Sequence, residues 1–293
     1  MILSQNRPSP FFYRWARIPL PAHRYLSTET IPEMNLATRQ SLNALNCRFY
    51  GERASEFDAT RKHEWPGWQR TIDLFHATSD TKPTPVLDIG CGNGRFAHFV
   101  LNNHPIGAID YTGVDQSPEL LAIAENECIG SKADSLRWLK VDVASEELER
   151  APLSDSYQLV VAFGLLHHIP SLDSRKKLIS FLARRLSAGG TLAFTVWRFD
   201  QAERFRSKLI PWQEYNQHAV EKIDTNELEP GDYLMSFGDT SGTPRYCHAP
   251  DEAEIRALTD SLGLECVAQF AADGKTGDLN EYHVFVKSDG DSH

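Results

Sequence analysis

The chain has no long hydrophobic run, no closely paired cysteines and no excess of basic charge, and each lack excludes a class of protein. Its 293 residues contain nothing near the roughly 18 consecutive apolar residues that cross a bilayer, so we expect no membrane span. The five cysteines are scattered without C-x-x-C spacing, which disfavours a disulfide framework or a zinc site and favours a reducing compartment. The net charge of −10 disfavours broad binding of nucleic acid, although a local basic patch stays possible.

Acidic residues are also missing from the first 28 residues, which contain four arginines and several serines. Phe11, Trp15 and Ile18 fall on one face of a possible helix, and arginines fall on another. This amphipathic pattern predicts a mitochondrial transit peptide. The alternative is a disordered tail, with Met34 as the true start of a cytosolic protein.

What the chain does contain, from about residue 85, is a regular alternation of strand and helix signals. The continuous apolar run 157–164 is typical of a strand buried on both faces. We expect strands at 85–90, 109–115, 135–143, 157–164, 191–197, 264–271 and 281–288, and helices at 93–103, 117–128, 171–190 and 250–263.

Local signals predict the ends of two of these helices. Ser117 is the expected N-cap of one, with Pro118 at its first position. Ser171 or Asp173 is the expected cap of the helix over 171–190, which Gly189 and Gly190 should end.

The alternation predicts an α/β fold, with a doubly wound, mostly parallel, seven-stranded sheet whose last strand is antiparallel. A weakly periodic, aromatic stretch after the fifth strand reads as an insertion on the substrate side. The expected organisation is a leader at 1–33, a helical cap at 34–80, the main domain at 81–287 with its insertion at 198–249, and a tail at 288–293.

The stretch VLDIGCGNGRF, residues 86–96, predicts a ligand site between the first strand and the first helix of the sheet. Gly90, Gly92 and Gly94 form G-x-G-x-G, whereas dinucleotides require G-x-G-x-x-G, so the third glycine is misplaced for a pyrophosphate. Asp88 lies just before these glycines, where a carboxylate suits a ligand with an ammonium group.

Two further acids follow at the next strand ends. Asp115 comes 21 residues after Gly94, and a carboxylate at that distance binds the hydroxyls of a ribose. Asp142 ends the third strand, where it can accept from an adenine amino group while Val143 packs on the ring. An ammonium, a vicinal diol and an exocyclic amine all occur in S-adenosylmethionine.

These segments, together with GVDQSPELL and LVVAFGLLHHI, resemble the class I S-adenosylmethionine-dependent methyltransferases over residues 84–197. The resemblance implies a Rossmann-like methyltransferase fold, S-adenosyl-L-methionine as cofactor and no metal. The cofactor-binding residues that it implies are Asp88, Gly90, Cys91, Gly92, Asp115, Gln116, Asp142, Val143, Phe163 and Gly164.

A narrower resemblance points to tRNA wobble-uridine carboxymethyl methyltransferases. It rests on FYGERASEFDATRKHEWPGW before the glycine turn, on LLHHI, and on RYCH in the insertion. The chain departs from that pattern at Cys247 and at Ala249-Pro250, which leaves the exact substrate open. The resemblance implies tRNA modification, and its eukaryotic members require a small zinc-binding activator subunit.

The candidate residues on the acceptor side are Arg61, Trp65, His167, His168, Arg245, Tyr246 and His248. An acceptor carboxylate needs cations and no base, which suits Arg61 and Arg245. A hydroxyl or amine acceptor needs a base, for which His168 or His167 is the candidate. Each also has a structural alternative, such as a surface charge for Arg61 and core packing for Trp65.

Three functions stay open at this point. The first is a tRNA methyltransferase acting on a modified wobble uridine, which the flanking segments favour. The second is a small-molecule O- or C-methyltransferase that acts on a quinone precursor or a carboxylic acid, which the net charge favours. The third is a non-catalytic partner protein with a methyltransferase-like fold, which the complete set of cofactor-side acids and glycines disfavours.

Overall fold

The computed structural model describes residues 33–76, 83–103, 108–131, 133, 135–237 and 243–289. The predicted transit peptide lies outside these described residues apart from Glu33, and so does most of the predicted tail. No helix within the described ranges is long and apolar enough to cross a bilayer.

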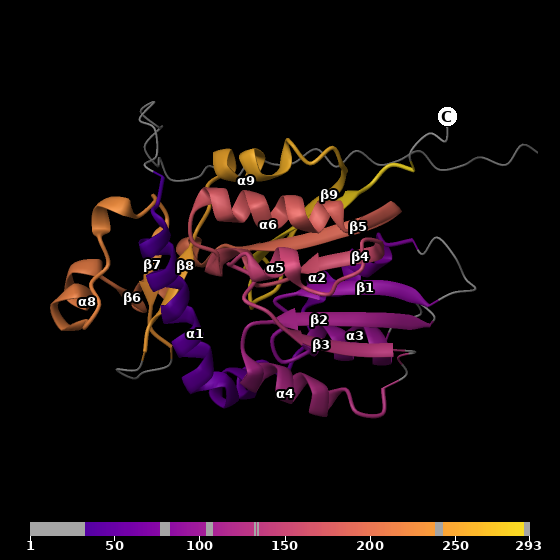
Figure 1. The fold of residues 1–293 in the computed structure, drawn as a ribbon, viewed down its shortest axis with the longest axis horizontal. Helices are drawn as coiled ribbons and strands as arrows, with labels where there is room; N and C mark the ends of the chain where they lie inside the picture. Colours follow the sequence, from indigo (N-terminus) through magenta and orange to yellow (C-terminus); the bar gives the residue numbers. More distant parts are fainter. Residues whose placement is uncertain are drawn as a thin grey trace, which may run out of the picture. The chain divides into compact units, whose positions relative to one another are not determined.

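The centre of the fold is a seven-stranded sheet with the strand order β3-β2-β1-β4-β5-β10-β9 (Figure 1). The first five of these strands are parallel, and β10 pairs antiparallel with both β5 and β9. This topology confirms the predicted doubly wound sheet with an antiparallel last strand. The strands are β1 (Thr84–Ile89), β2 (Ile109–Asp115), β3 (Ser135–Lys140), β4 (Tyr157–Ala162), β5 (Leu186–Trp197), β9 (Glu265–Ala272) and β10 (Asn280–Val286).

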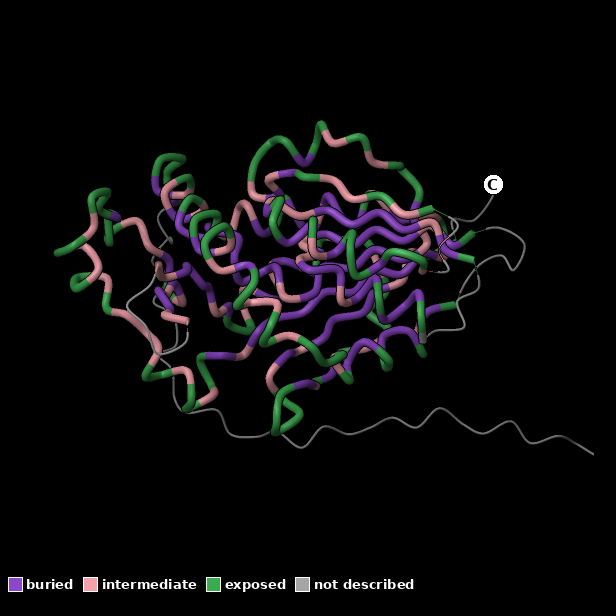
Figure 2. Tube along the Cα trace, turned by 90° about the horizontal axis from the view of Figure 1, so that it is seen from below, coloured by how far each residue is buried: buried purple, intermediate pink, exposed green. Residues whose placement is uncertain are grey.

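Alternation along the buried strands divides the core between the two faces of the sheet. Leu87 and Ile89 belong to one apolar cluster and Val86 to the other, because successive side chains point to opposite faces. The central strands are buried throughout, and the edge strands β3 and β9 are largely exposed (Figure 2).

Helices cover both faces of this sheet. Side chains of α6 and α9 belong to the first cluster, and side chains of α2 and α3 belong to the second. The helices around the sheet are α1 (Leu36–Ala59), α2 (Pro66–Asp73), α3 (Arg95–Asn103), α4 (Pro118–Glu127), α5 (Glu147–Arg150), α6 (Leu172–Arg184) and α9 (Glu252–Thr259). A short 3₁₀ helix, η1 (Leu166–His168), follows β4.

The predicted helix starts are confirmed, and one predicted helix end is wrong. Ser117 caps α4, and Ser171 rather than Asp173 caps α6. However, α6 ends at Arg184, and Gly189 and Gly190 lie inside β5. The reason is that their backbones hydrogen-bond to Lys287 just beyond β10, so a neighbouring strand rather than a helix end satisfies them.

Residues 199–248 form a second, antiparallel sheet with the order β6-β7-β8. The sequence predicted no strands here, because strands of two to four residues are too short to show a period. The elements are η2 (Phe199–Gln201), α7 (Glu203–Arg206), β6 (Leu209–Ile210), α8 (Trp212–His218), η3 (Thr225–Glu227), β7 (Asp232–Met235) and β8 (Arg245–His248).

Helix α1 runs past the carboxyl ends of the parallel strands (Figure 1). The side chain of Asn35 caps it, and a kink with non-helical backbone lies at Arg53. Asn43 bonds to Asp142 after β3, and Tyr50 bonds to His168 after β4. The helix therefore closes the edge of the sheet at which the acids and the glycine turn lie.

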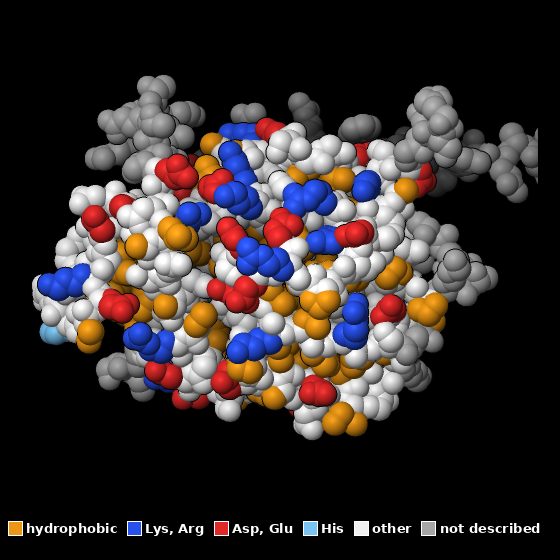
Figure 3. All heavy atoms as spheres, viewed as in Figure 1, with side chains coloured by type: hydrophobic (Ala, Val, Ile, Leu, Met, Phe, Trp, Pro, Cys, Tyr) orange, Lys and Arg blue, Asp and Glu red, His pale blue; other side chains and the backbone are white. Residues whose placement is uncertain are grey.

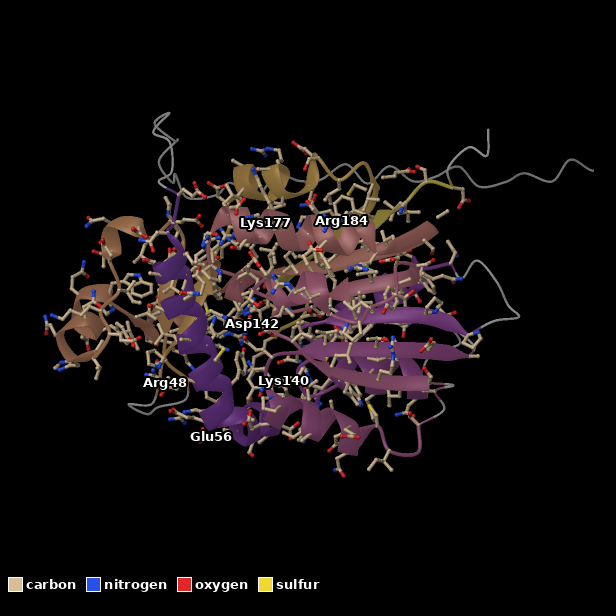
Figure 4. The ribbon with its side chains drawn as sticks, in the orientation of Figure 1. Arg48, Glu56, Lys140, Asp142, Lys177 and Arg184 are labelled. Atoms are coloured by element: carbon tan, nitrogen blue, oxygen red, sulfur yellow. The ribbon has the colours of Figure 1, made fainter. Side chains whose placement is uncertain are left out.

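Lys177 and Arg184 are paired on the exposed side of α6, whereas Arg175 of the same helix is buried. Lys177 forms an ion pair with Asp173, and Arg184 forms one with Glu149. Figure 3 shows acidic and basic side chains interspersed on this side of the molecule, and Figure 4 shows Lys177 and Arg184 on α6. This mixed surface does not favour contact with phosphates.

Candidate active site

The glycine turn has the strained backbone that its composition predicts. Gly90, Gly92 and Gly94 have φ angles of 76°, 55° and 74°, in the left-handed region that favours glycine. A Cβ on Gly94 would lie only 2.7 Å from the Cβ of Ala124, so this glycine allows α3 and α4 to pack closely. A Cβ on Gly92 would meet nothing within 4 Å, which leaves room for a ligand against the backbone.

Asp88 is a buried acid beside this turn. Its Oδ2 accepts a hydrogen bond from the Tyr111 hydroxyl at 2.6 Å, which leaves Oδ1 for a ligand. Burial raises the pKa of Asp88 to about 7, and the bond from Tyr111 offsets only part of that rise. A ligand cation at Oδ1 would favour the ionised form.

Asp115 ties the glycine turn to the end of β2. Its two carboxylate oxygens accept hydrogen bonds from the backbone N–H groups of Gly92 and Ser117, both at 2.9 Å. Burial raises the pKa of Asp115, and these backbone bonds oppose the rise. Each oxygen keeps a second lone pair, so the carboxylate can still accept from a diol.

Asp142 lies apart from the other two acids. It borders a separate hollow of about 370 Å³ that it shares with Gln116 and Cys47. Its Oδ2 accepts from the Asn43 amide of α1 at 2.8 Å, and its Oδ1 accepts from a backbone N–H. Figure 4 shows Asp142 between α1 and the sheet. Asp88 and Asp115 therefore line one cavity while Asp142 borders another hollow, where α1 lies against it.

A cavity of about 570 Å³ opens at this edge of the sheet. It combines the glycine turn with side chains from α1, from η1 and from the β6-β7-β8 sheet. The predicted residues that line it are Asp88, Gly90, Cys91, Gly92, Asp115, Gln116, Val143, Phe163, Gly164, Arg61, Trp65, Arg245, His167 and His168.

Arg245 of β8 is an almost completely buried cation without an acidic partner. Its guanidinium carbon lies 5.1 Å from the ring centroid of Trp197 and 5.3 Å from that of Phe49. Its Nη2 donates to the Met235 sulfur at 3.6 Å, and its Nε is buried with no hydrogen bond. No carboxylate of the described residues forms an ion pair with it.

Arg61 is a second cation of the cavity without a described carboxylate partner. Its guanidinium stacks over the ring of Phe57, 3.9 Å from the centroid, and donates to the Thr60 hydroxyl. Burial, together with the charge of Arg245, lowers the pKa of Arg61 to about 10. Arg61 and Arg245 thus repel one another in the absence of an anion between them.

His167 adds an unpartnered polar group to the same place. Its Nδ1 is buried with no hydrogen bond, and its ring lies 4.9 Å from that of Trp197. Burial lowers the pKa of His167 well below its ordinary value, and the positive charges of Arg245 and Arg61 act in the same direction. A neutral imidazole can donate a hydrogen bond here without adding charge.

The cofactor end of the cavity fits S-adenosylmethionine by its donor set. The open face of Gly92 admits a ligand, Asp88 offers an oxygen to an ammonium, and Asp115 offers lone pairs to a ribose. The positive φ angles at the turn leave backbone N–H groups at the start of α3 near that ligand.

Comparisons with known proteins agree with this fit. Residues 87–192 match a family profile described as a methyltransferase domain. The tRNA (carboxymethyluridine(34)-5-O)-methyltransferase of Schizosaccharomyces pombe is 24% identical over 222 residues, which cover 73% of this chain and 86% of that protein. The chain is a class I S-adenosylmethionine-dependent methyltransferase.

Two further comparisons extend this result. The malonyl-[acyl-carrier protein] O-methyltransferase of a Paenibacillus strain is 34% identical over 149 residues, which cover 49% of this chain but only 51% of that relative. A solved complex that contains the Trm112 methyltransferase activator of Haloferax volcanii includes a chain with a TM-score of 0.54 at 16% identity, over 84% of this chain and 99% of that one. The structural likeness shows a shared fold.

His168 of this methyltransferase is not a free base. Its Nδ1 lies 2.9 Å from the Tyr246 carbonyl oxygen, and its Nε2 lies 2.7 Å from the Tyr50 hydroxyl. Burial lowers the pKa of His168 to about 3, and the charge of Arg245 contributes to the fall. The prediction that His168 acts as a catalytic base therefore disagrees with the geometry, since both ring nitrogens are already engaged.

Tyr246 and His248, predicted to bind the acceptor, do not reach the cavity of the methyltransferase. They alternate with Arg245 along β8, so their side chains point to the other face of the small sheet. There the Tyr246 hydroxyl donates to Asp232 at 2.7 Å, and His248 lies between Asp232 and Glu254. Both residues belong to a buried structural network.

Two groups of described side chains have the spacing of metal ligands, and neither is suited to the role. The first combines His167, His168 and Cys247. Both nitrogens of His168 are engaged, and burial raises the pKa of the Cys247 thiol to about 11, so it offers no thiolate. The second combines Glu229, Asp232 and His248, which are already bonded to one another or to Arg175.

Trp65 packs in the core and also borders the cavity, the two roles that the sequence left open for it. One side of its ring packs against Trp68 at 5.3 Å between centroids, as in a core. The ring also borders the cavity, where its edge would lie 3.2 Å from a Cβ on Gly164. The glycine at 164 is therefore required to let this tryptophan approach the end of β4.

The sequence missed several residues that line the cavity of the methyltransferase. Tyr50 lies within the segment that resembles tRNA methyltransferases, but a tyrosine on a helix carries no separate signal. Arg204, Lys208 and Phe237 come from the insertion, where no period was detectable. The one signal in the sequence was a group of basic residues in an otherwise acidic chain.

Proposed function

We propose that this methyltransferase esterifies the carboxylate of an acidic acceptor, and that the acceptor is a carboxymethylated wobble uridine of tRNA. One observation carries the proposal: Arg61 and Arg245 line the cavity without a carboxylate partner among the described residues. Burying an unpaired cation is costly, so such a pair is best explained by an anionic ligand that completes it.

The chemistry of this acceptor matches the groups present. S-adenosylmethionine supplies an already activated methyl group, so positioning and the exclusion of water account for most of the catalysis. A carboxylate is ionised at neutral pH and attacks without a base. Arg61 and Arg245 would hold one of its oxygens by charge-assisted bonds while the other faces the methyl group. His167 would contribute a neutral hydrogen bond.

Two considerations favour tRNA as the carrier of that carboxylate. The relative from Schizosaccharomyces pombe matches over most of its length and is named for carboxymethyluridine at position 34. The cavity also has three further cations, Arg95, Arg204 and Lys208, that form no ion pair within the described residues. They give an acidic protein a local site for a phosphate backbone. An activator subunit of the Trm112 type is an expected partner.

A malonyl group on an acyl-carrier protein is the second candidate. The relative from Paenibacillus is 34% identical over about half of its length, and its name also describes O-methylation of a molecule with a carboxylate. The net charge of −10 is easier to reconcile with this acceptor than with a polyanion.

Radiolabelled methyl transfer from S-adenosylmethionine distinguishes the two acceptors. The purified protein, with and without a Trm112-type subunit, is assayed with three acceptors: tRNA bearing carboxymethyluridine, the same tRNA lacking the carboxymethyl group, and malonyl-acyl-carrier protein. We expect label only in the first. Label in the acyl-carrier protein alone would establish the second candidate, and equal label in both tRNAs would refute a carboxylate acceptor.

A further inference from the structure

Tyr50 is the one phenol of the described residues that lines the cavity, and its environment is unusually well defined. It lies on α1, where its ring makes edge contacts with Phe49 and Phe57 at centroid distances of 5.0 and 5.1 Å. Its hydroxyl lies 2.7 Å from Nε2 of His168. Arg61 and Arg245 line the same cavity, and their charges act on this phenol. Packing on both sides of the ring sets its orientation.

The tautomer of His168 follows from its other contact. Nδ1 of His168 lies 2.9 Å from the Tyr246 carbonyl oxygen and 3.3 Å from the amide nitrogen of Asn46. The carbonyl is the nearer partner and can only accept a hydrogen bond, so Nδ1 carries the proton and the Asn46 amide donates to the His168 carbonyl instead. Neutral His168 then has a lone pair at Nε2, and the hydroxyl of Tyr50 must donate to it.

Asn46, one turn before Tyr50 on α1, holds this arrangement in place. Its Oδ1 accepts from the Tyr246 N–H at 2.9 Å, and its Nδ2 donates to the His168 carbonyl at 3.3 Å. Helix α1, η1 and β8 are thereby fixed to one another at the wall of the cavity.

We infer that Tyr50 and His168 form a positioning pair for the acceptor, in which the neutral imidazole takes the phenol's only hydrogen and so turns the oxygen lone pairs toward Arg61 and Arg245. The inference rests on the proposed function, because it assumes that these guanidinium groups bind the acceptor. Neither Tyr50 nor His168 transfers a proton. With its hydrogen committed, the phenol can only accept from the guanidinium groups, and it keeps them oriented for a carboxylate.

Substitutions that separate positioning from base catalysis test this inference. Tyr50→Phe keeps the ring and removes the hydroxyl, and we expect a roughly tenfold lower kcat/KM for the acceptor, mainly through KM. His168→Ala should cost about the same. His168→Gln should recover most of that loss, since its amide oxygen can accept from Tyr50. The double variant Tyr50→Phe/His168→Ala should be no worse than either single change.

Base catalysis by His168 predicts a different outcome. His168→Ala and His168→Gln would then both lower kcat by about 10²–10⁴-fold, and Tyr50→Phe would leave activity intact. That result would overturn the inference, and so would additive losses in the double variant. Tyr215→Phe on α8 is the matched control, because it removes a hydroxyl away from the cavity and should change neither kcat nor KM.

A spectroscopic measurement keeps this test separate from the proposed function. In the wild-type protein, ¹⁵N NMR of labelled histidine should show His168 as the neutral tautomer protonated at Nδ1, whatever the acceptor is. Tyr50→Phe should shift its Nε2 resonance and leave the Nδ1 proton in place. A tautomer protonated at Nε2 would contradict the pair, even if no acceptor were known. A wild-type protein that labels neither proposed acceptor would instead refute the proposed function.

Discussion

Two buried arginines of this protein differ in one respect that separates structure from function. Arg175 of α6 is fully buried and completely paired: it bonds to Glu229 and Glu254, both at 2.5 Å, and to the Ile169 carbonyl at 2.9 Å. Arg245 of β8 is nearly as buried, but its neighbours are a thioether, aromatic rings and the Tyr50 hydroxyl, and no carboxylate of the described residues pairs with it.

The electrostatics of the two sites follow from their partners. Burial alone would lower the pKa of Arg175, but the charges of Glu254 and Glu229 outweigh it and raise the pKa. Arg245 forms no ion pair with any carboxylate of the described residues. The paired Arg175 joins α6 and α9 to the second sheet, whereas the unpaired Arg245 can bind an anionic ligand. The pairing of a buried charge is therefore more informative about function than its burial.

Matched substitutions should show this contrast most strongly in stability. Arg175→Met leaves the buried Glu229 without its cation and leaves Glu254 with His248 alone, and we expect a loss of about 3–5 kcal/mol in the free energy of unfolding. Arg245→Met keeps similar volume and removes an unpaired charge, so the change should be within about 1 kcal/mol. Denaturant unfolding measures both. Equal losses would contradict the distinction.

Methyl-transfer activity, unlike stability, should depend more on Arg245 than on Arg175. Arg245→Ala or Arg61→Ala removes a charge-assisted bond to the acceptor and should lower kcat/KM about 30- to 1000-fold, roughly 2–4 kcal/mol of transition-state binding. Lysine should rescue little, because it cannot form the planar fork. Calorimetry should find the affinity for S-adenosylmethionine nearly unchanged. If both alanine variants kept full activity, no anionic acceptor would bind there.

The cofactor end can be tested on its own. Asp115→Ala removes the carboxylate expected to accept from the ribose and should weaken S-adenosylmethionine binding by about 1.5–3 kcal/mol. Asp110→Ala is the matched control, since Asp110 lies on the same strand, away from the cavity, and its side chain accepts from Ser135. Calorimetry measures the affinity of both variants for S-adenosylmethionine. Unchanged affinity in Asp115→Ala would show that β2 does not contact the cofactor.

The smallest expected effect concerns pH. The pKa of Asp88 is raised by burial to about 7, and an ammonium binds its ionised form. As the pH falls below 7 the free protein holds Asp88 protonated, so binding must release a proton and weakens. Between about pH 8 and about pH 6 the dissociation constant should rise roughly tenfold. Asp88→Asn should bind weakly at both values, and a wild-type affinity independent of pH would refute this role.

The sequence predicted the sheet and the cofactor end well, because both depend on local patterns. The glycines and acids at 88–94 and 115 lie within or beside single strands, where period and turn chemistry are readable. The carboxyl ends of parallel strands then meet at one edge without further information. The family resemblance added the identity of the ligand.

The acceptor end was predicted less well, because it depends on contacts between distant segments. Nothing in the RYCH segment showed that Arg245 faces the cavity while Tyr246 and His248 face away, since that requires the register of β8 on β7. His168 looked like a base until α1 placed Tyr50 against one nitrogen and β8 placed a carbonyl against the other. The sequence also did not show that Asp142 lies outside this cavity, in a separate hollow where Asn43 of α1 bonds to it.

The chemical nature of the product tests the carboxylate acceptor most directly. After transfer of a radiolabelled methyl group to carboxymethylated tRNA, the isolated nucleosides are treated with mild alkali. A methyl ester hydrolyses under these conditions, so the account predicts that the label leaves as volatile methanol and that carboxymethyluridine is recovered. Label that resists alkali and stays on the nucleoside would show methylation at nitrogen, carbon or a hydroxyl group, and would contradict a site built around Arg61 and Arg245 for a carboxylate.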